Sequence, residues 1–339
     1  MLYPDFIGIG AQKAGTTWLS HNLQLHPEIW MPPLKEIHYF DEKIHDPANI
    51  VPRLARRLFG KRVVDRRWRR QVKTRMVKHT KRFSRDDLLW DLRYYAGMPG
   101  DEWYASLFEP GRGKVSGEIT PAYSMLEPGV IAHIHEKLPW AKIVFLMRNP
   151  IERAWSQTVM QFEKSKKRAI DTVADTKLRR TFEREGSRLR TDYLRTLENW
   201  GAFYPEEQIF VGFLEDIYFF PEELLSRLYG FLGVDPSFRP PGMAQRVHSR
   251  SASQVPTKSI IYLARAYRDE ITRLGEHFGG YASFWLYGAE RLIEDPPNEK
   301  AIPYPLWESA IWDEWVDGSR ANSPRPQLQS APLPAVRVV

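Results

Sequence analysis

The sequence contains no cysteine among its 339 residues. Without thiols the chain can form no disulfide bond, no cysteine nucleophile and no zinc–thiolate centre. It also lacks any run of 18 apolar residues, so the sequence predicts no membrane-spanning helix. No basic leader precedes the first apolar segment, so no secretory signal is expected. These absences favour a protein that works in the reducing cytoplasm.

Acidic residues are almost missing from residues 53–82, which hold 14 Lys and Arg but one acid, Asp65. The rest of the chain holds 35 basic and 41 acidic residues, so this segment accounts for the formal charge of +7. A segment of this kind attracts polyanions, or it is a solvated basic helical insertion. Few aromatic side chains accompany the charges, so a base-stacking platform and a nucleic-acid partner are not expected.

Short apolar runs that alternate with amphipathic segments predict an α/β protein whose central parallel sheet is covered by helices on both faces. The expected strands are 6–10, 114–120, 141–148 and 208–216, and the expected helices are 16–25 and those that begin near Pro128, Pro150, Asp192 and Pro221. We expect one domain over residues 1–318, with a basic helical insertion at about 50–96. The tail 319–339, rich in Pro, Ser and Gln, is expected to be disordered.

The first strand ends in a glycine-rich turn, GIGAQKAGTTWL, at residues 8–19. Such a turn from a strand into a helix points backbone N–H groups at an anion, and the helix dipole assists. The lysine of a Walker A loop would follow the second glycine, but here Lys13 lies two residues before Gly15. Thr16 and Thr17 can donate hydroxyl hydrogen bonds to phosphate oxygens. The alternative is a plain turn in which glycine only relieves steric crowding.

A second set of residues, LMRNPIERAWSQ, follows the expected strand 141–148. Arg148 lies where that strand ends, and open α/β sheets bind ligands beyond the carboxyl ends of their strands. Arg148 can pair with a phosphate, and Ser156, two helical turns later, can donate a further hydrogen bond. Alternatively Arg148 forms a structural ion pair and Ser156 lies on a helix face.

With these two motifs the chain resembles the sulfotransferases that use 3′-phosphoadenosine 5′-phosphosulfate, especially the carbohydrate-type and bacterial branch. The segments KEIHYFDE (35–42), GEITPAY (117–123) and 193–217 match the family in the expected order, and the resemblance covers roughly residues 5–280. It implies a three-layer, P-loop-like fold and in-line transfer of a sulfuryl group to a hydroxyl or amine, without a metal. It also implies 3′,5′-adenosine bisphosphate as the product.

The resemblance implies a role for each matching residue. The 5′-phosphosulfate would lie against the loop, and the 3′-phosphate against Arg148 and Ser156. The nucleotide-binding loop residues are Gly10, Gln12, Lys13, Ala14, Gly15, Thr16, Thr17 and Trp18. Lys13 would also neutralise the leaving oxygen, and such preorganised charge contributes on the order of 3 kcal/mol. Lys35, Asp41 and Glu118 are expected to contact the acceptor, which is a glycan, a glycolipid or a hydroxylated metabolite.

The resemblance implies that Glu36 is the base that removes the acceptor proton, if its surroundings raise its pKa. The positive charge of Lys35 beside it would lower that pKa. His38 is the rival base, because an extended segment would put both side chains on one face. The family's nucleotide-closing Lys-Gly pair is replaced by RVHSRSAS (246–253), so Arg246, His248 or Arg250 takes that place. The family's usual lysine after the Glu of GEITPAY is replaced by Ile119.

Two other functions compete with this interpretation. A P-loop kinase or NTPase would need Mg·ATP and an acid after a buried strand, whereas the strand 141–148 leads into Arg148-Asn149. A non-catalytic polyanion-binding protein would use residues 53–82 and would show a steep dependence on salt.

Overall fold

The computed structural model describes residues 1–41, 50–165, 170–243 and 253–322. Its centre is a five-stranded sheet in the order β2-β3-β1-β4-β5, and every pairing is parallel. The strands are β1 (Phe6–Gly10), β2 (Ile29–Trp30), β3 (Val115–Ile119), β4 (Lys142–Met147) and β5 (Ile209–Phe213). The expected α/β fold with a central parallel sheet is confirmed.

The sheet is buried on both faces, which explains why β1, β4 and β5 are nearly continuous apolar runs rather than alternating ones. All five residues of the central strand β1 are buried. On the neighbouring strand β3, a side chain at Gly117 would collide with the ring of Phe6, so glycine lets the two strands pack closely. The carboxyl end of β1 at Gly10 therefore lies in the middle of the sheet edge, where the glycine-rich turn begins.

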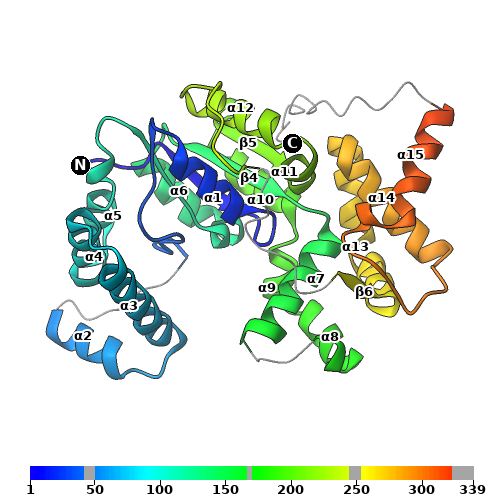
Figure 1. Cartoon of the computed structure of the whole chain (residues 1–339), viewed down its shortest axis with the longest axis horizontal. Helices are drawn as coiled ribbons and strands as arrows, with labels where there is room; N and C mark the ends of the chain where they lie inside the picture. Colours follow the sequence, from blue (N-terminus) through cyan, green and yellow to red (C-terminus); the bar gives the residue numbers. More distant parts are fainter. Residues whose placement is uncertain (42–49, 166–169, 244–252, 323–339) are drawn as a thin grey trace.

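Helices connect the strands and enclose the sheet (Figure 1). They are α1 (Thr16–Leu25), α6 (Pro128–Lys137), α7 (Pro150–Met160), α8 (Asp175–Phe182), α9 (Glu185–Leu189), α10 (Tyr193–Gly201), α11 (Leu214–Phe219) and α12 (Pro221–Leu232). The strand expected over 208–216 ends early, because α11 begins at Leu214. The carboxylate of Asp216 accepts the N–H of Phe213 at 3.2 Å and so closes the start of this helix.

The basic segment forms helices that project from one end of the molecule (Figure 1). These are α2 (Ile50–Phe59), α3 (Val63–Lys81) and α4 (Arg85–Ala96), followed by α5 (Asp101–Ser106). Asp91 joins α4 to α3, because its carboxylate lies 2.9 Å from Arg75 Nε and 2.7 Å from His79 Nε2. Ser84 begins α4 by accepting the N–H of Asp87 at 3.3 Å.

The last part of the chain lies at the opposite end (Figure 1). It contains an antiparallel pair of strands, β6 (Gln254–Pro256) and β7 (Ala301–Pro303), and the helices α13 (Thr257–Phe278), α14 (Gly280–Glu294) and α15 (Ala310–Asn322). Because α15 runs to Asn322, the domain boundary expected at 318 falls inside this helix. The rest of the expected tail, 323–339, is outside the described residues.

One-turn helices complete the chain. They are η1 (Glu109–Gly111), η2 (Pro121–Met125), the π-helical turn η3 (Gln161–Ser165), η4 (Ile170–Thr172), η5 (Glu206–Gln208) and η6 (Leu306–Glu308). Within the described ranges, no helix combines the length and the apolar composition that crossing a bilayer requires.

Candidate active site

The loop between β1 and α1 has a backbone that only some residues can adopt. Gly15 has a φ of 89°, in the left-handed region, and a side chain there would collide with Ile217. Lys13 also has a positive φ, 76°, and its carbonyl oxygen accepts a hydrogen bond from Arg148 Nη1 at 3.1 Å. The loop thus curls back over the end of β4, and the first N–H groups of α1 lack intrahelical partners, as at any helix start.

Two lysines lie at this loop. Lys35 Nζ donates to the hydroxyl oxygens of Thr16 and Thr17 at 3.3 and 3.1 Å, and lies 3.4 Å from Glu36 Oε1. Burial lowers the pKa of Lys35, and the neighbouring Glu36 opposes that shift. The ammonium group of Lys35 is thus held at the threonines of the loop, and its expected contact with the acceptor stays a prediction. Lys13 Nζ lies 3.9 Å from Met160 Sδ.

The proposed base and its rival lie side by side, but not in the way an extended strand would place them. Glu36 and His38 have φ angles of 67° and 59°, so the backbone turns at both residues. This corrects the expected extended segment. His38 Nε2 nevertheless lies 3.4 Å from Glu36 Oε2, and His38 Nδ1 lies 2.8 Å from Asp41 Oδ2. Asp41 thus holds the imidazole ring, and its expected contact with the acceptor stays a prediction.

These contacts set the charges of the two candidates. Burial alone would lower the pKa of His38, but hydrogen bonds to Asp41 and Glu36 outweigh it and raise the pKa to about 9. Burial alone would raise the pKa of Glu36, but the hydrogen bond to His38 and the charge of Lys35 outweigh it and lower the pKa. At neutral pH His38 is therefore an imidazolium and Glu36 a carboxylate. Of the two, Glu36 is the group able to accept a proton.

Arg148 lies where β4 ends, and its guanidinium is buried and well bonded. It donates to Glu152 Oε2 from Nε at 3.2 Å and from Nη2 at 3.0 Å, and also to the hydroxyl of Tyr304. Leu306 N donates to the other oxygen of Glu152 at 2.8 Å. Four of the five N–H donors of an arginine are thereby used, counting the one to Lys13. The ion pair that the sequence left as an alternative is present, and one N–H donor has no partner among the described residues.

Ser156 lies on α7, two turns beyond Arg148, and is half-buried. Its hydroxyl makes no hydrogen bond within the part of the chain that the structure describes. Gln12 Oε1 is buried, again without a partner among the described residues. Two polar groups of the expected nucleotide site therefore have unused hydrogen-bonding capacity.

Some expected site residues are placed elsewhere. The indole N–H of Trp18 donates to Met243 O at 2.7 Å, so this side chain anchors α1 in the core. Glu118 is 1% exposed and accepts hydrogen bonds from Tyr104, Thr120 and Tyr123 at 2.7, 2.7 and 3.1 Å. The structure places Glu118 among three hydroxyl groups, and its expected contact with an acceptor stays a prediction. Arg246, His248 and Arg250 lie outside the described residues.

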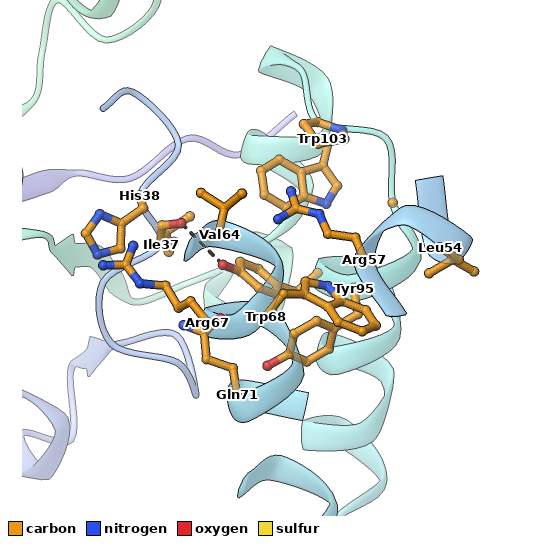
Figure 2. Close-up of a pocket in the computed structure, with 13 residues that line it drawn as sticks. Ile37, His38, Leu54, Arg57, Val64, Arg67, Trp68, Gln71, Tyr95 and Trp103 are labelled. Carbon is orange, nitrogen blue, oxygen red and sulfur yellow. Dashed lines mark hydrogen bonds between the residues drawn. The ribbon is translucent and has the colours of Figure 1, made fainter. Parts of the chain in front are cut away.

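A pocket opens beside His38, between the core and the basic helices (Figure 2). It holds about 610 Å³ of empty space, including the solvent at its mouth. Its lining residues are Ile37, His38, Leu54, Arg57, Val64, Arg67, Trp68, Gln71, Tyr94, Tyr95, Gly97, Pro99 and Trp103. Among the residues that the structure describes, the lining combines aromatic rings with cationic groups and includes no Asp or Glu. Trp90, an aromatic residue of the same region, is instead buried in the core, where its indole donates to Leu107 O at 2.9 Å.

A model of the sulfotransferase family matches residues 4–239 of this chain. The chain belongs to the sulfotransferase family. The match contains the loop, the Glu36–His38 segment and Arg148 with Ser156, and it ends before the strands β6 and β7 and the last three helices.

Two known proteins are similar to this sulfotransferase. The "Membrane-associated sulfotransferase kil1" of Dictyostelium discoideum is 30% identical over 158 residues, which is 45% of this chain and 22% of that protein. The chain thus spans about a fifth of the relative's length in this match. The crystal structure of a sulfotransferase from Alicyclobacillus acidocaldarius is 20% identical, with a TM-score of 0.53, and the match covers 81% of this chain and 96% of that one. The latter likeness supports the fold.

Sequence reasoning missed several residues around this site. Glu152 could have been noticed, because it lies four residues after Arg148, in the first turn of the helix that follows, and can therefore reach it. Tyr304 could not, because it lies 156 residues from Arg148 and outside the family match. Arg57, Arg67 and Trp68 belong to the basic segment, whose position beside His38 depends on tertiary packing. Within the described ranges, no group of three or more His, Asp or Glu could hold a metal ion.

Proposed function

We propose that this sulfotransferase transfers the sulfuryl group of 3′-phosphoadenosine 5′-phosphosulfate to a hydroxyl or amine of an acceptor in the pocket beside His38. The observation that carries the proposal is the position of Lys35. Its ammonium group contacts Thr16 and Thr17 of the loop and also Glu36. The anion-binding loop and the proton acceptor are thus adjacent, as a transfer between a bound anion and an acceptor requires.

The residues present fit this donor at both ends. Lys13, Lys35 and the two threonines supply positive charge and hydroxyl donors for the 5′-phosphosulfate. Arg148 has one donor left, and the hydroxyl of Ser156 is unused, so both can serve the 3′-phosphate. The buried, unpaired Gln12 Oε1 can accept one further hydrogen bond from the nucleotide.

The reaction needs one bond formed and one broken. The acceptor oxygen forms a bond to sulfur, and the bond between sulfur and the bridging phosphate oxygen breaks, in line. The electron pair stays on the phosphate, and 3′,5′-adenosine bisphosphate leaves. Glu36 takes the acceptor proton, while Lys13 neutralises the leaving oxygen. Because the pKa of Glu36 is lowered, the proton moves as the new bond makes the acceptor oxygen more acidic.

The lining of the pocket indicates the class of acceptor. Arg57 and Arg67 supply positive charge, as does His38, and Trp68, Tyr95 and Trp103 supply ring surfaces. We therefore propose an acceptor that carries a ring, a hydroxyl and an anionic group, as an acidic glycoside does. The cytoplasmic location suggested by the cysteine-free sequence is also proposed.

Thermal unfolding tests the choice of donor. A ligand at 100 times its Kd stabilises a protein by about 2.7 kcal/mol, which raises the midpoint by several degrees. We expect that rise with 3′,5′-adenosine bisphosphate and a much smaller one with the Lys13→Ala variant. A rise with Mg·ATP but not with the bisphosphate would overturn the proposal and favour a kinase.

Calorimetric titration tests the acceptor class with a matched pair of probes, 4-nitrophenyl β-D-glucuronide and 4-nitrophenyl β-D-glucoside. The charged probe should bind about tenfold more tightly, and Arg67→Ala should remove that preference without weakening the neutral probe. Arg66→Ala is the control, because this neighbouring arginine is exposed and does not line the pocket. If both probes bound equally tightly, or if neither bound, the proposal of an anionic acceptor would be wrong. Both results can be obtained without the sulfuryl donor, so they are independent of the donor test.

A further inference from the structure

The helix α2 presents an apolar face to solvent. Its exposed residues with described side chains are Val51, Pro52, Ala55, Leu58 and Phe59. Their spacing places them on one stripe of the helix, and every one is apolar. Val51 is 74% and Phe59 82% exposed, so no described part of the chain covers the ends of this stripe. An amphipathic helix in a folded protein normally turns this face to the core.

Other exposed apolar side chains gather in the same insertion. Of the 14 large hydrophobic residues that are exposed in the described ranges, ten lie between residues 51 and 98. They are Val51, Leu58, Phe59, Met76, Val77, Phe83, Leu88, Leu89, Leu92 and Met98. Single exposed apolar residues are ordinary, but a concentration in one projecting element indicates an interaction surface.

Exposed cations accompany this surface directly after α2. Lys61, Arg66, Arg70 and Lys73 are exposed, and none forms an ion pair in the part of the chain that the structure describes. The one acid of residues 53–82, Asp65, is buried and pairs with Arg62 at 3.0 Å, so it does not neutralise them. Two copies of this segment would repel each other, and the surface is complementary to an anion.

We propose that the outward face of α2, with the cations that follow it, docks on an anionic lipid bilayer. Apolar side chains enter the boundary between headgroups and acyl chains, while the neighbouring cations contact anionic headgroups. The same helix contributes Leu54 and Arg57 to the pocket beside His38 (Figure 2). Docking therefore brings one wall of that pocket to the membrane surface. The proposal concerns binding alone and does not depend on the donor or the reaction.

Sedimentation with lipid vesicles tests the proposed docking. One set of vesicles contains phosphatidylcholine alone, and the other contains about a third phosphatidylserine. The wild-type protein should bind the mixed vesicles, and added salt should weaken that binding. Replacing Leu58 and Phe59 by Ser should weaken binding about tenfold or more. Replacing Lys61, Arg66, Arg70 and Lys73 by Gln should weaken binding further, by about 10²–10³, since each cation near the surface contributes about fivefold.

The control is Trp140→Ser, which removes an apolar side chain about as exposed as Leu58 but outside the insertion, and should leave vesicle binding unchanged. The thermal midpoint of each variant shows that it is folded. The proposal would be wrong if the wild-type protein did not bind the mixed vesicles. It would also be wrong if the Leu58/Phe59 variant bound them as tightly as the wild type. If size-exclusion chromatography showed a dimer that the same variant dissociates, a second copy would cover this face instead and the proposal would be wrong.

Discussion

His38 Nε2 lies 3.4 Å from Glu36 Oε2, and the opposite ring nitrogen lies 2.8 Å from Asp41. The imidazolium is thus placed between two carboxylates, and it keeps Glu36 ionised. This arrangement separates the roles of two residues that the sequence alone leaves as competing bases: Glu36 can accept a proton, while His38 orients it and contributes charge.

Replacement of Glu36 by Gln should lower the turnover of sulfuryl transfer by about 10²–10⁴, because the proton acceptor is lost. The Kd of 3′,5′-adenosine bisphosphate should change little, since the loop residues remain. His38→Gln should lower turnover less. Steady-state kinetics and calorimetric titration would measure both quantities. A Glu36→Gln variant that stays active while His38→Gln is inactive would make His38 the base.

The stability of the protein should fall at high pH because of His38. Its pKa in the folded protein, about 9, is above the ordinary value of 6.5, so the charged ring stabilises the fold fully below pH 6.5. That contribution, on the order of 2 kcal/mol, is lost as the pH rises through 9. Urea unfolding at pH 6 and pH 10 should therefore show a larger difference for the wild type than for His38→Gln. Equal differences in the two proteins would show that the ring is not held as an imidazolium.

Lys13→Ala should lower kcat by about 10²–10³, because a preorganised charge at the leaving oxygen is removed. Lys35→Met should weaken donor binding as well, since its ammonium group is held at the threonine hydroxyls of the loop. Lys114→Ala, at an exposed position, is the control and should be fully active. Kinetics with varied donor concentration separate the two effects. An active Lys13→Ala enzyme would refute the assignment of the loop.

Glu152→Gln should lower the free energy of unfolding by about 3 kcal/mol, because it leaves the buried Arg148 without its charge partner. The side chains of Arg148 and Glu152 are 6% and 1% exposed. The matched control is Glu127→Gln, which breaks the pair between Glu127, 70% exposed, and Arg195. That change should cost less than about 1 kcal/mol. Urea unfolding of both variants would test the comparison, and equal losses would show that burial does not strengthen the pair at Arg148.

Much of the fold could be predicted from the sequence, because its signals are local. The apolar runs of β1 and β4 and the glycine at position 15 depend on residues that are neighbours in the chain. For the same reason the glycine-rich turn could be located after β1, and Arg148 could be placed at the end of a strand. The end of β5 could not be predicted, because the apolar run continues through Leu214, where α11 already begins. The carboxylate of Asp216 closes the start of that helix by accepting the N–H of Phe213.

The sequence by itself determined the α/β fold, the loop at Lys13 and the choice of family, since each depends on spacing along the chain. Only the tertiary structure decided which way the side chains face. It placed Lys35 on Thr16 and Thr17, buried Glu118 among hydroxyl groups, and brought Tyr304 to Arg148. It also turned the apolar face of α2 outward. These outcomes depend on packing between segments that are far apart in the sequence. Local periodicity and backbone preference carry no information about such packing.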